Sequence, residues 1–369
     1  MRFIGFLLAC FVAATAPAQN YYMFVGTYTS GQSEGIYVYR FNTLTGDASR
    51  ISTFASKNPS YLCISPNGKY LYAVNENGQN GEVSSFVFDR GTGQLHFINK
   101  QSSGGADPCY ITEDKSSRWV FVANYSSGSL SALPVKADGS LGPLAQNIQH
   151  TGTGANKERQ EKAHVHSTVL SPDQHYLYTA DLGLDREFIY RFDPEKKMPL
   201  SPAKDSFVAV DPGSGPRHFV FHPTKPYAYL IDELSGTVDV FSFNSVTGAL
   251  KHEQRISSHP DNFKGQKGSA DIHISPNGKF LYASNRGDAN SIAIYSIDAG
   301  GKLHSKGFQS TDGVHPRNFT IDPKGHFLLV ANRDTDNVVI FSINPQSGML
   351  TSTGKQIKIP NPVCLKLLN

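Results

Sequence analysis

Residues 272–297 read IHISPNGKFLYASNRGDANSIAIYSI, and the pattern of this stretch decides the fold. A short alternating run is followed by a Ser-Pro-Asn-Gly turn, a second alternating run, a polar turn and a third run. Alternation with a period of two between clusters of turn residues is typical of short, half-buried β-strands. The stretch therefore predicts three antiparallel strands joined by tight turns.

The same pattern recurs along the chain. Copies begin at the following residues: Pro59, Cys109, His166, Arg217, Ile272 and Arg317. The aligned prolines Pro172, Pro223, Pro276 and Pro323 lie about 50 residues apart. A Thr-Gly or Ser-Gly turn after the third run introduces a fourth strand, and four antiparallel strands in about 50 residues make one blade of a β-propeller. Tryptophan-aspartate repeats are excluded, because the chain has a single tryptophan.

The number of blades follows from a count of first strands. Six lie in the copies above, and a seventh lies at residues 361–367 (NPVCLKL), close to the C-terminus. The second and third strands of that blade are expected at residues 22–27 and 35–41, so the C-terminal strand would complete the N-terminal blade and leave no exposed sheet edge. The sequence predicts an all-β, seven-bladed β-propeller over residues 19–369, with four antiparallel strands per blade.

Residues 1–18 are expected to be a cleaved signal peptide. Arg2 provides the positive start, residues 3–14 form an apolar core, and Ala-Pro-Ala at residues 16–18 forms a cleavage site. The mature chain would begin at Gln19, in the periplasm or outside the cell, without a membrane anchor. An alternative makes Cys10 a lipobox cysteine, but the apolar stretch continues beyond it and Leu8 fits that motif poorly.

Composition narrows the class of function. The 33 glycines and 21 prolines fit many turns, and the net charge of +3 comes without a long basic run. Nucleic acid is therefore not an expected partner, because phosphate binding requires clustered Lys and Arg. Cys63, Cys109 and Cys364 lie in apolar strand contexts without metal-ligand spacing, so we expect buried free thiols, no metal and no cofactor.

Blade topology places polar side chains at one mouth of the central channel. The start of each first strand and the end of each second strand lie on the same face, because the two strands are antiparallel. The starts carry the following residues: Asp107, His164, His166, Arg217, His218, Asp271, His273, His315 and Arg317. The ends carry these: Asn75, Glu76, Asn124, Asp181, Asp232, Glu233, Asn285, Arg286, Asn332 and Arg333. Strand parity decides which of them face the channel.

The repeat set resembles the seven-bladed β-propeller lactonase family, which includes the propeller form of 6-phosphogluconolactonase and is related to fungal carboxymuconate-lactonizing enzymes. The matching segments are RQEKAHVHS (159–167), TADLGLDR (179–186), GSGPRHFVFHP (213–223), DEL (232–234), SADIHISPNGKFLYASNRG (269–287) and HPRNF (315–319). Their order covers nearly the whole mature chain. The resemblance implies a lactonase whose catalytic residues are His166, Arg217, Glu233 and Arg286.

These residue types suit metal-independent hydrolysis of a small anionic lactone, such as 6-phosphogluconolactone or a related aldonolactone. Glu233 or His166 would accept a proton from water, and Arg217 and Arg286 would hold an anion or stabilise the oxyanion. We expect further substrate contacts from His164, Asp181, His218, His273 and Arg317, and a monomeric enzyme. The alternatives are a cycloisomerase of the carboxymuconate-lactonizing type and a non-catalytic propeller that binds a glycan or a protein.

Each assignment has a structural alternative. Arg217 and Arg286 could brace neighbouring blades through ion pairs, and Glu233 could be the partner of such an arginine. His164 and His166 share a strand face, as metal ligands do, but no third ligand is indicated. The polar stretch of residues 154–162 is expected to be a lid over the mouth rather than a solvated loop.

Overall fold

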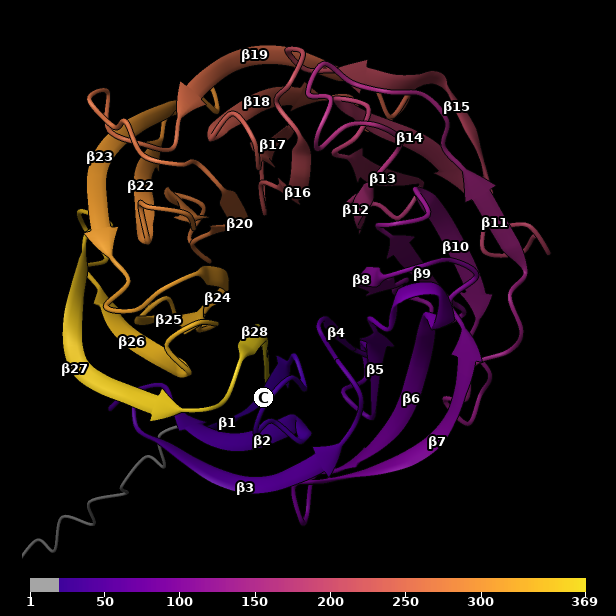
Figure 1. Ribbon diagram of the computed structural model, residues 1–369, viewed down its shortest axis with the longest axis horizontal. Coiled ribbons are helices and arrows are strands. Elements are labelled where there is room, and N and C mark those ends of the chain that lie inside the picture. The colour runs from indigo at the N-terminus through magenta and orange to yellow at the C-terminus, as the bar shows by residue number, and fades with distance from the viewer. Residues whose placement is uncertain (1–19) are drawn as a thin grey trace, which may run out of the picture.

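The computed structural model describes residues 20–369, which form seven four-stranded antiparallel sheets arranged in a ring. Viewed down the ring axis, the blades follow one another around an open centre, and the C-terminal end lies beside the N-terminal strands (Figure 1). The predicted fold class is confirmed. The signal-peptide prediction for residues 1–18 lies outside the described residues.

Blades 1 to 4 contain the strands of the N-terminal half of the described chain, together with the C-terminal strand. From the innermost strand outward, blade 1 contains β28 (Pro362–Leu368), β1 (Asn20–Thr27), β2 (Gly35–Asn42) and β3 (Ala48–Ala55). Blade 2 contains β4 (Leu62–Ile64), β5 (Tyr70–Asn75), β6 (Glu82–Asp89) and β7 (Gln94–Ser102). Blade 3 contains β8 (Pro108–Glu113), β9 (Trp119–Asn124), β10 (Ser129–Pro134) and β11 (Gln146–Gln149). Blade 4 contains β12 (Val165–Leu170), β13 (Tyr176–Asp181), β14 (Arg186–Phe192) and β15 (Leu200–Ala209).

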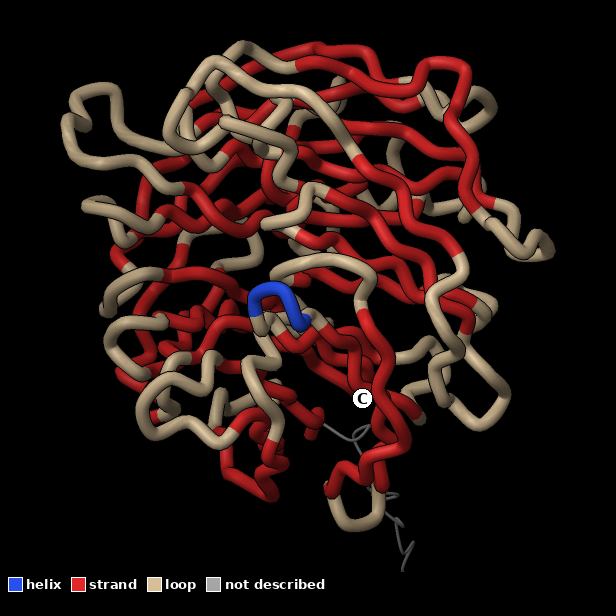
Figure 2. The backbone as a smooth tube through the Cα atoms, turned by 45° about the vertical axis from the view of Figure 1, so that its right-hand side comes forward, coloured by secondary structure: helices blue, strands red, loops and turns tan. Residues whose placement is uncertain are grey.

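Blades 5 to 7 repeat the same order. Blade 5 contains β16 (Pro216–Phe221), β17 (Tyr227–Asp232), β18 (Thr237–Phe243) and β19 (Leu250–Ser257). Blade 6 contains β20 (Ser269–Ile274), β21 (Phe280–Asn285), β22 (Ser291–Ile297) and β23 (Leu303–Ser310). Blade 7 contains β24 (Pro316–Ile321), β25 (Phe327–Asn332), β26 (Asn337–Ile343) and β27 (Leu350–Lys358). One short 3-10 segment, η1 (Gly78–Asn80), interrupts the strands and loops of the described chain (Figure 2).

The Ser-Pro-Asn-Gly signal forms the tight turn that joins β20 to β21. The Ser275 hydroxyl donates to the Asn277 side chain at 2.7 Å, and the Gly278 N–H donates to the Ser275 carbonyl at 2.8 Å. Gly278 has φ +69°, a conformation that glycine adopts without a steric penalty. The turn residues therefore set where β20 ends and β21 begins.

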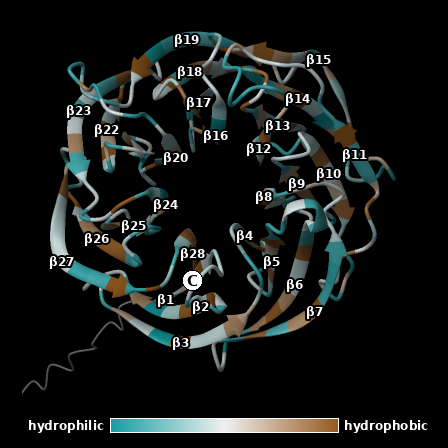
Figure 3. Ribbon diagram, in the orientation of Figure 1, coloured by the Kyte–Doolittle hydropathy of each residue, from teal (hydrophilic) through white to brown (hydrophobic). Residues whose placement is uncertain are grey.

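Burial follows the position of a strand within its blade. The second strands are almost entirely buried; every residue of β21 is buried, for example. The outermost strands are largely exposed, and Figure 3 shows hydrophilic residues along much of β19 and β23. The core therefore lies between adjacent blades, where the buried faces of the inner strands meet.

Tyrosines of the second strands tie neighbouring blades together. The hydroxyl of Tyr229 donates to the Gly301 carbonyl at 2.9 Å, and that of Tyr282 donates to the Gly348 carbonyl at 2.8 Å. Each acceptor lies in the turn between the third and fourth strands of the next blade. The tyrosine at the third position of these second strands thus serves both the buried core and the contact between blades.

The C-terminal strand closes the ring as predicted. β28 pairs antiparallel with β1, with Leu365 opposite Val25, and the Tyr28 N–H donates to the Asn361 carbonyl at 3.1 Å. The two ends of the chain therefore share one sheet, and the innermost strand of blade 1 is paired rather than exposed.

The cysteines agree only in part with the expectation of buried free thiols. Cys63, Cys109 and Cys364 are free thiols, but only Cys109 and Cys364 are buried, because Cys63 lies on the short innermost strand β4 and is partly exposed. Within residues 20–369, no helix is long and apolar enough to cross a membrane.

Candidate active site

A β-bulge at the start of the first strand positions the central side chains of the site. In five blades the pairing between first and second strands skips one residue of the first strand, and the skipped residues are Cys109, His166, Arg217, Arg317 and Val363. A bulge re-aims the extra residue, and bulges are common beside active sites. Three of these skipped residues, Cys109, His166 and Arg317, border a cavity at the channel mouth, and Arg217 lies directly behind it.

A second set of side chains comes from the residue that follows each second strand. This position holds Tyr28 after β1, Glu76 after β5, Tyr125 after β9, Glu233 after β17 and Arg286 after β21. All five border the same cavity. Two positions of the blade repeat therefore supply most of its wall.

The cavity has a volume of about 220 Å³ and lies at the mouth that the strand directions predict. It is bordered by the following residues: Tyr28, Glu76, Cys109, Tyr125, Arg159, His166, Glu233, Arg286 and Arg317. The structure thus brings together four residues expected from the sequence, namely His166, Glu233, Arg286 and Arg317.

Glu233 is the centre of an ion-pair cluster. Its Oε1 lies 2.6 Å from Arg159 Nη2, and its Oε2 lies 3.0 Å from Arg217 Nε and 2.8 Å from Arg286 Nη2. Burial alone would raise the pKa of this carboxyl group, but Arg286 and Arg217 outweigh burial and hold the pKa well below its usual value. Glu233 is therefore a carboxylate throughout the neutral range and a weak proton acceptor.

His166 has the opposite character. The side chain is buried, and burial together with the positive charge of Arg217 holds its pKa well below 6.5. Its Nδ1 has no hydrogen-bond partner within residues 20–369. The ring is therefore neutral near pH 7, its Nδ1 is buried and unpaired among the described residues, and His166 as a residue borders the cavity.

Arg317 is a cation of the cavity whose donors are all free within the described residues. Its guanidinium lies 5.4 Å from the ring centre of Tyr28, and it makes no hydrogen bond or ion pair within the described part of the chain. The Tyr28 hydroxyl instead donates to both carboxylate oxygens of Glu76, at 3.1 and 3.0 Å. Unsatisfied guanidinium donors that border a cavity suit an anionic or oxyanionic ligand.

Arg217 and His218 belong to a buried chain of hydrogen bonds behind Glu233. Arg217 Nη1 donates to His218 Nε2 at 3.2 Å, so His218 carries its proton on Nδ1, which lies 2.7 Å from Asp271 Oδ1. Burial, with a further contribution from Arg217, lowers the pKa of His218 to about 4. In this arrangement Arg217 holds Glu233 in place and does not border the cavity.

The structure places the remaining predicted contact residues away from this cavity. His164 stacks on Tyr125 with ring centres 4.5 Å apart, and Asp181 is fully buried with its Oδ2 2.7 Å from His150 Nδ1. His218 and His273 border a separate cavity of about 280 Å³, which also includes turn residues of the opposite face. Their positions follow from the bulge, because residues beyond it face the channel at greater depth.

Five residues of the cavity wall were not expected as catalytic or contact residues, although Glu76 was expected at the mouth: Tyr28, Glu76, Cys109, Tyr125 and Arg159. Four of them occupy the two repeat positions described above, so alignment of the blades by strand ends would have identified them. Arg159 has no such signal, because it comes from the connection between blades 3 and 4.

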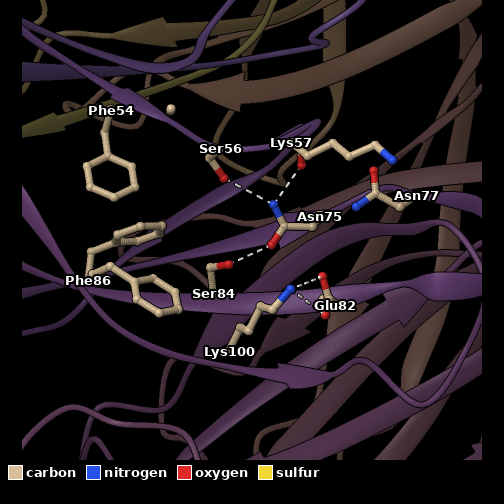
Figure 4. A pocket seen from close by; sticks show the side chains of 11 residues that line it. Phe54, Ser56, Lys57, Asn75, Asn77, Glu82, Ser84, Phe86 and Lys100 are labelled. Carbon is tan, nitrogen blue, oxygen red and sulfur yellow. Dashed lines mark hydrogen bonds and ion pairs between the residues drawn. The ribbon is translucent and has the colours of Figure 1, made fainter.

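A larger groove of about 480 Å³ lies between blades 1 and 2 (Figure 4). Its principal polar groups bond to one another: Asn75 Nδ2 donates to Ser56 Oγ and the Lys57 carbonyl, and Lys100 pairs with Glu82 at 2.8 Å. The channel cavity, in contrast, combines the unpartnered His166 Nδ1 with the free Arg317 guanidinium. We therefore place the candidate site in the channel cavity.

Comparison with known proteins finds relatives whose alignments cover nearly the whole chain. The family model described as "Lactonase, 7-bladed beta-propeller" matches residues 22–367. A 6-phosphogluconolactonase of Formosa agariphila is 41% identical over 352 residues, which cover 94% of this chain and 99% of the relative. A 6-phosphogluconolactonase of Bacillus subtilis is 36% identical over 352 residues, which cover 95% and 99%.

Solved structures show the same similarity. A putative 6-phosphogluconolactonase from Bacteroides fragilis superposes with a TM-score of 0.92 at 42% identity, covering 96% of this chain and 100% of that one. The periplasmic gluconolactonase of Pseudomonas aeruginosa superposes with a TM-score of 0.91 at 39% identity, covering 95% and 99%.

Proposed function

The chain belongs to the lactonase family of seven-bladed β-propellers, and from this premise we propose that it is a lactonase that opens a sugar-derived lactone to the aldonic acid. The observation that carries the proposal is the composition of the channel cavity. A neutral histidine with a free nitrogen, an arginine with free donors and a carboxylate held by three arginines border the same small space. Hydrolysis of a cyclic ester requires a proton acceptor for water and a positive group for the developing oxyanion.

We assign water activation to His166 rather than to Glu233. Burial and Arg217 lower the pKa of His166 as well. Its imidazole Nδ1 is nevertheless unpaired within the described residues and can accept the proton of the attacking water, whereas three arginines already occupy the Glu233 carboxylate. The nearby negative charge of Glu233 would stabilise the imidazolium that forms. That imidazolium then returns the proton to the ring oxygen as the ester bond breaks, which yields the hydroxy acid.

The arginines stabilise negative charge in this scheme. Arg317 and the remaining N–H groups of Arg286 border the cavity and would donate to the tetrahedral oxyanion and to the product carboxylate. Removal of one such donor typically costs about 100-fold to 1,000-fold in kcat. Arg217 acts from behind, since its contacts with Glu233 and His218 fix the carboxylate that orients Arg159 and Arg286.

Relatives differ in the lactone that their names specify. Two are named 6-phosphogluconolactonase, and one structural neighbour is described as a periplasmic gluconolactonase. This neighbour and the expected signal peptide support the proposal that the enzyme is exported to the periplasm. There it would act on an aldonolactone formed outside the cytosol. We therefore propose glucono-1,5-lactone and its 6-phosphate as the two substrates to compare.

Proton release from both lactones tests the proposal, with the chain from Gln19 onward, a chelator present and spontaneous hydrolysis subtracted. We expect turnover by the wild type, a loss of at least 100-fold in kcat for His166→Gln, and a loss of similar size for Glu233→Ala. His304→Gln is the matched control, because His304 is exposed on the outermost strand of blade 6 and pairs with Asp298. Full activity in His166→Gln would contradict its role as base. No wild-type turnover of either lactone would favour a cycloisomerase or a binding protein.

A further inference from the structure

A second cavity of about 240 Å³ adjoins the channel cavity. Its border includes Arg159, Glu233, Lys267, Arg286 and His315. Three of these, Arg159, Glu233 and Arg286, also border the channel cavity. The ion pair between Arg159 and Glu233 therefore forms a partition with one cavity on each side.

The partition is held in place by its own loop. The side chain of Gln160 is fully buried and donates to the Leu182 carbonyl at 2.8 Å and to Asp185 Oδ1 at 2.7 Å. Its Oε1 accepts the Asn156 N–H, and the Asn156 side chain in turn accepts the Arg159 N–H at 3.1 Å. The loop thus presents Arg159 in a defined position, although 44% of the Arg159 side chain is exposed.

His315 provides an unused acceptor in the second cavity. Its Nδ1 lies 3.4 Å from Asp334 Oδ2, and its buried Nε2 has no hydrogen-bond partner within residues 20–369. Burial, with contributions from Arg286 and Arg333, lowers the pKa of this ring to about 3, so the ring is neutral. A neutral Nε2 can accept a hydrogen bond from a ligand hydroxyl.

The backbone at His315 strengthens this inference. His315 precedes the proline of its blade and has φ +63°. The matching positions of other blades hold Asn58, Asp107 and Asn361, whose φ values lie between +42° and +51°. Asn and Asp tolerate this left-handed conformation through their short polar side chains. Blade 7 instead carries an imidazole at this position, and the residue borders the cavity.

Positive charge dominates the rest of the wall. Lys267 Nζ donates to the Ser235 carbonyl at 2.9 Å and is otherwise open to solvent, and Arg286 donates to the Gly268 and Ser269 carbonyls. Glu233 is the carboxylate that borders this cavity, and three arginines already neutralise it. The cavity therefore combines cationic donors with one neutral acceptor.

We propose that this second cavity, the distal subsite, binds the hydroxylated, anion-bearing end of the substrate while the lactone ring lies in the channel cavity across the Arg159–Glu233 partition. Lys267 and Arg286 bind the anionic group, and His315 accepts from a neighbouring hydroxyl. The proposal rests on the proposed lactonase function for the location of the ring. It makes Arg159, Lys267 and His315 residues that determine specificity between charged and uncharged sugar lactones.

Equilibrium binding of the ring-opened products tests the distal subsite without turnover. Isothermal titration calorimetry with gluconate and with gluconate 6-phosphate would be performed on the wild type, Lys267→Gln, His315→Asn and the control Lys264→Gln. Asn suits the backbone of residue 315, because Asn58 and Asn361 hold the same conformation in their blades. Lys264 is an exposed lysine of the same loop that does not border the cavity.

We expect wild-type protein to bind gluconate 6-phosphate more tightly than gluconate. Lys267→Gln should raise the Kd of gluconate 6-phosphate about tenfold and that of gluconate less than twofold, because one charge-assisted hydrogen bond to the phosphate is lost. His315→Asn should weaken the binding of both ligands, and Lys264→Gln should leave the binding of both unchanged. Equal affinity of the wild type for the two ligands, or an equal effect of Lys267→Gln on both, would overturn the proposal. This binding pattern without turnover of either lactone would contradict only the proposed function.

Discussion

Glu233 and Glu187 are both buried glutamates, and their surroundings move their pKa values in opposite directions. Three arginines surround Glu233 and lower its pKa. Glu187 on β14 has no hydrogen-bond partner for either carboxylate oxygen within residues 20–369, and burial, with contributions from Asp232 and Asp181, raises its pKa well above 4.5. The first glutamate is charged and organises the site, whereas the second is neutral and lies between blades 4 and 5.

A raised pKa of Glu187 predicts a specific pH dependence of stability. The folded state retains a proton that the unfolded chain loses above pH 4.5, so this residue stabilises the fold at low pH and progressively less as the pH rises toward its folded pKa. Each pH unit in that window costs about 1.4 kcal/mol. We expect Glu187→Gln to gain stability over the wild type as the pH rises from about 4.5 toward neutrality.

Urea unfolding of the wild type and Glu187→Gln at several pH values measures this difference. Glu34→Gln is the control, because Glu34 is exposed. A constant difference between Glu187→Gln and the wild type across the pH range would show that Glu187 does not carry this proton.

At the scale of elements, β28 has more influence on the ring than its length suggests. Val363, Cys364 and Leu365 are buried, and the strand contacts β1 within its own blade and β24 and β4 of the two neighbouring blades. Burial of a Val or Leu side chain contributes about 1.5–3 kcal/mol, so the strand carries several kcal/mol of a total stability that is typically about 5–15 kcal/mol. Its loss would also expose the inner edge of β1.

We therefore expect a chain without residues 361–369 to lack a cooperative unfolding transition, because its ring is no longer stably folded near room temperature. We also expect it to aggregate more than the wild type. Thermal unfolding followed by circular dichroism, together with size-exclusion chromatography, measures both effects. Deletion of Asn369 alone is the control, because this exposed residue lies beyond β28. A deletion protein of residues 20–360 that melts as sharply as the wild type would show that closure by β28 is not required.

At the scale of the whole molecule, the propeller begins with the first described residue, Asn20. The proposed signal peptide ends two residues earlier, so cleavage would leave the complete β1 strand available for the sheet that β28 closes. Folding of blade 1 requires both ends of the chain, and the ring can therefore close only after the whole chain has been synthesised. Export before folding is compatible with this order of events.

The export proposal predicts a mature chain that starts at Gln19 and fractionates with periplasmic proteins. N-terminal sequencing of the protein after cell fractionation measures both properties, with a variant that carries Ala16→Leu and Ala18→Leu expected to remain uncleaved, because small residues define the cleavage site. Cytosolic protein that retains Met1 would contradict the proposal. The lactonase assignment does not depend on this outcome.

The fold and part of the site could be predicted from local sequence patterns. Turn residues and alternation specify strands locally, and a repeat of about 50 residues then leaves a closed ring of blades as the way to bury every inner strand. The channel mouth followed from strand direction alone. His166, Glu233, Arg286 and Arg317 were therefore expected near one another, and the structure brings them to one cavity.

Only the tertiary structure decided which side chains face that cavity. A bulge adds one residue to the first strand and reverses its parity, so Arg317 reaches the cavity while His218 lies deeper in the channel. Arg159 comes from a loop whose position depends on the distant contacts of Gln160 with Leu182 and Asp185. The sequence alone determined the ring and the channel mouth where polar side chains gather, because both follow from local periodicity. The contacts of Glu233 and the division of the mouth depend on packing between residues far apart in the chain, which local periodicity does not encode.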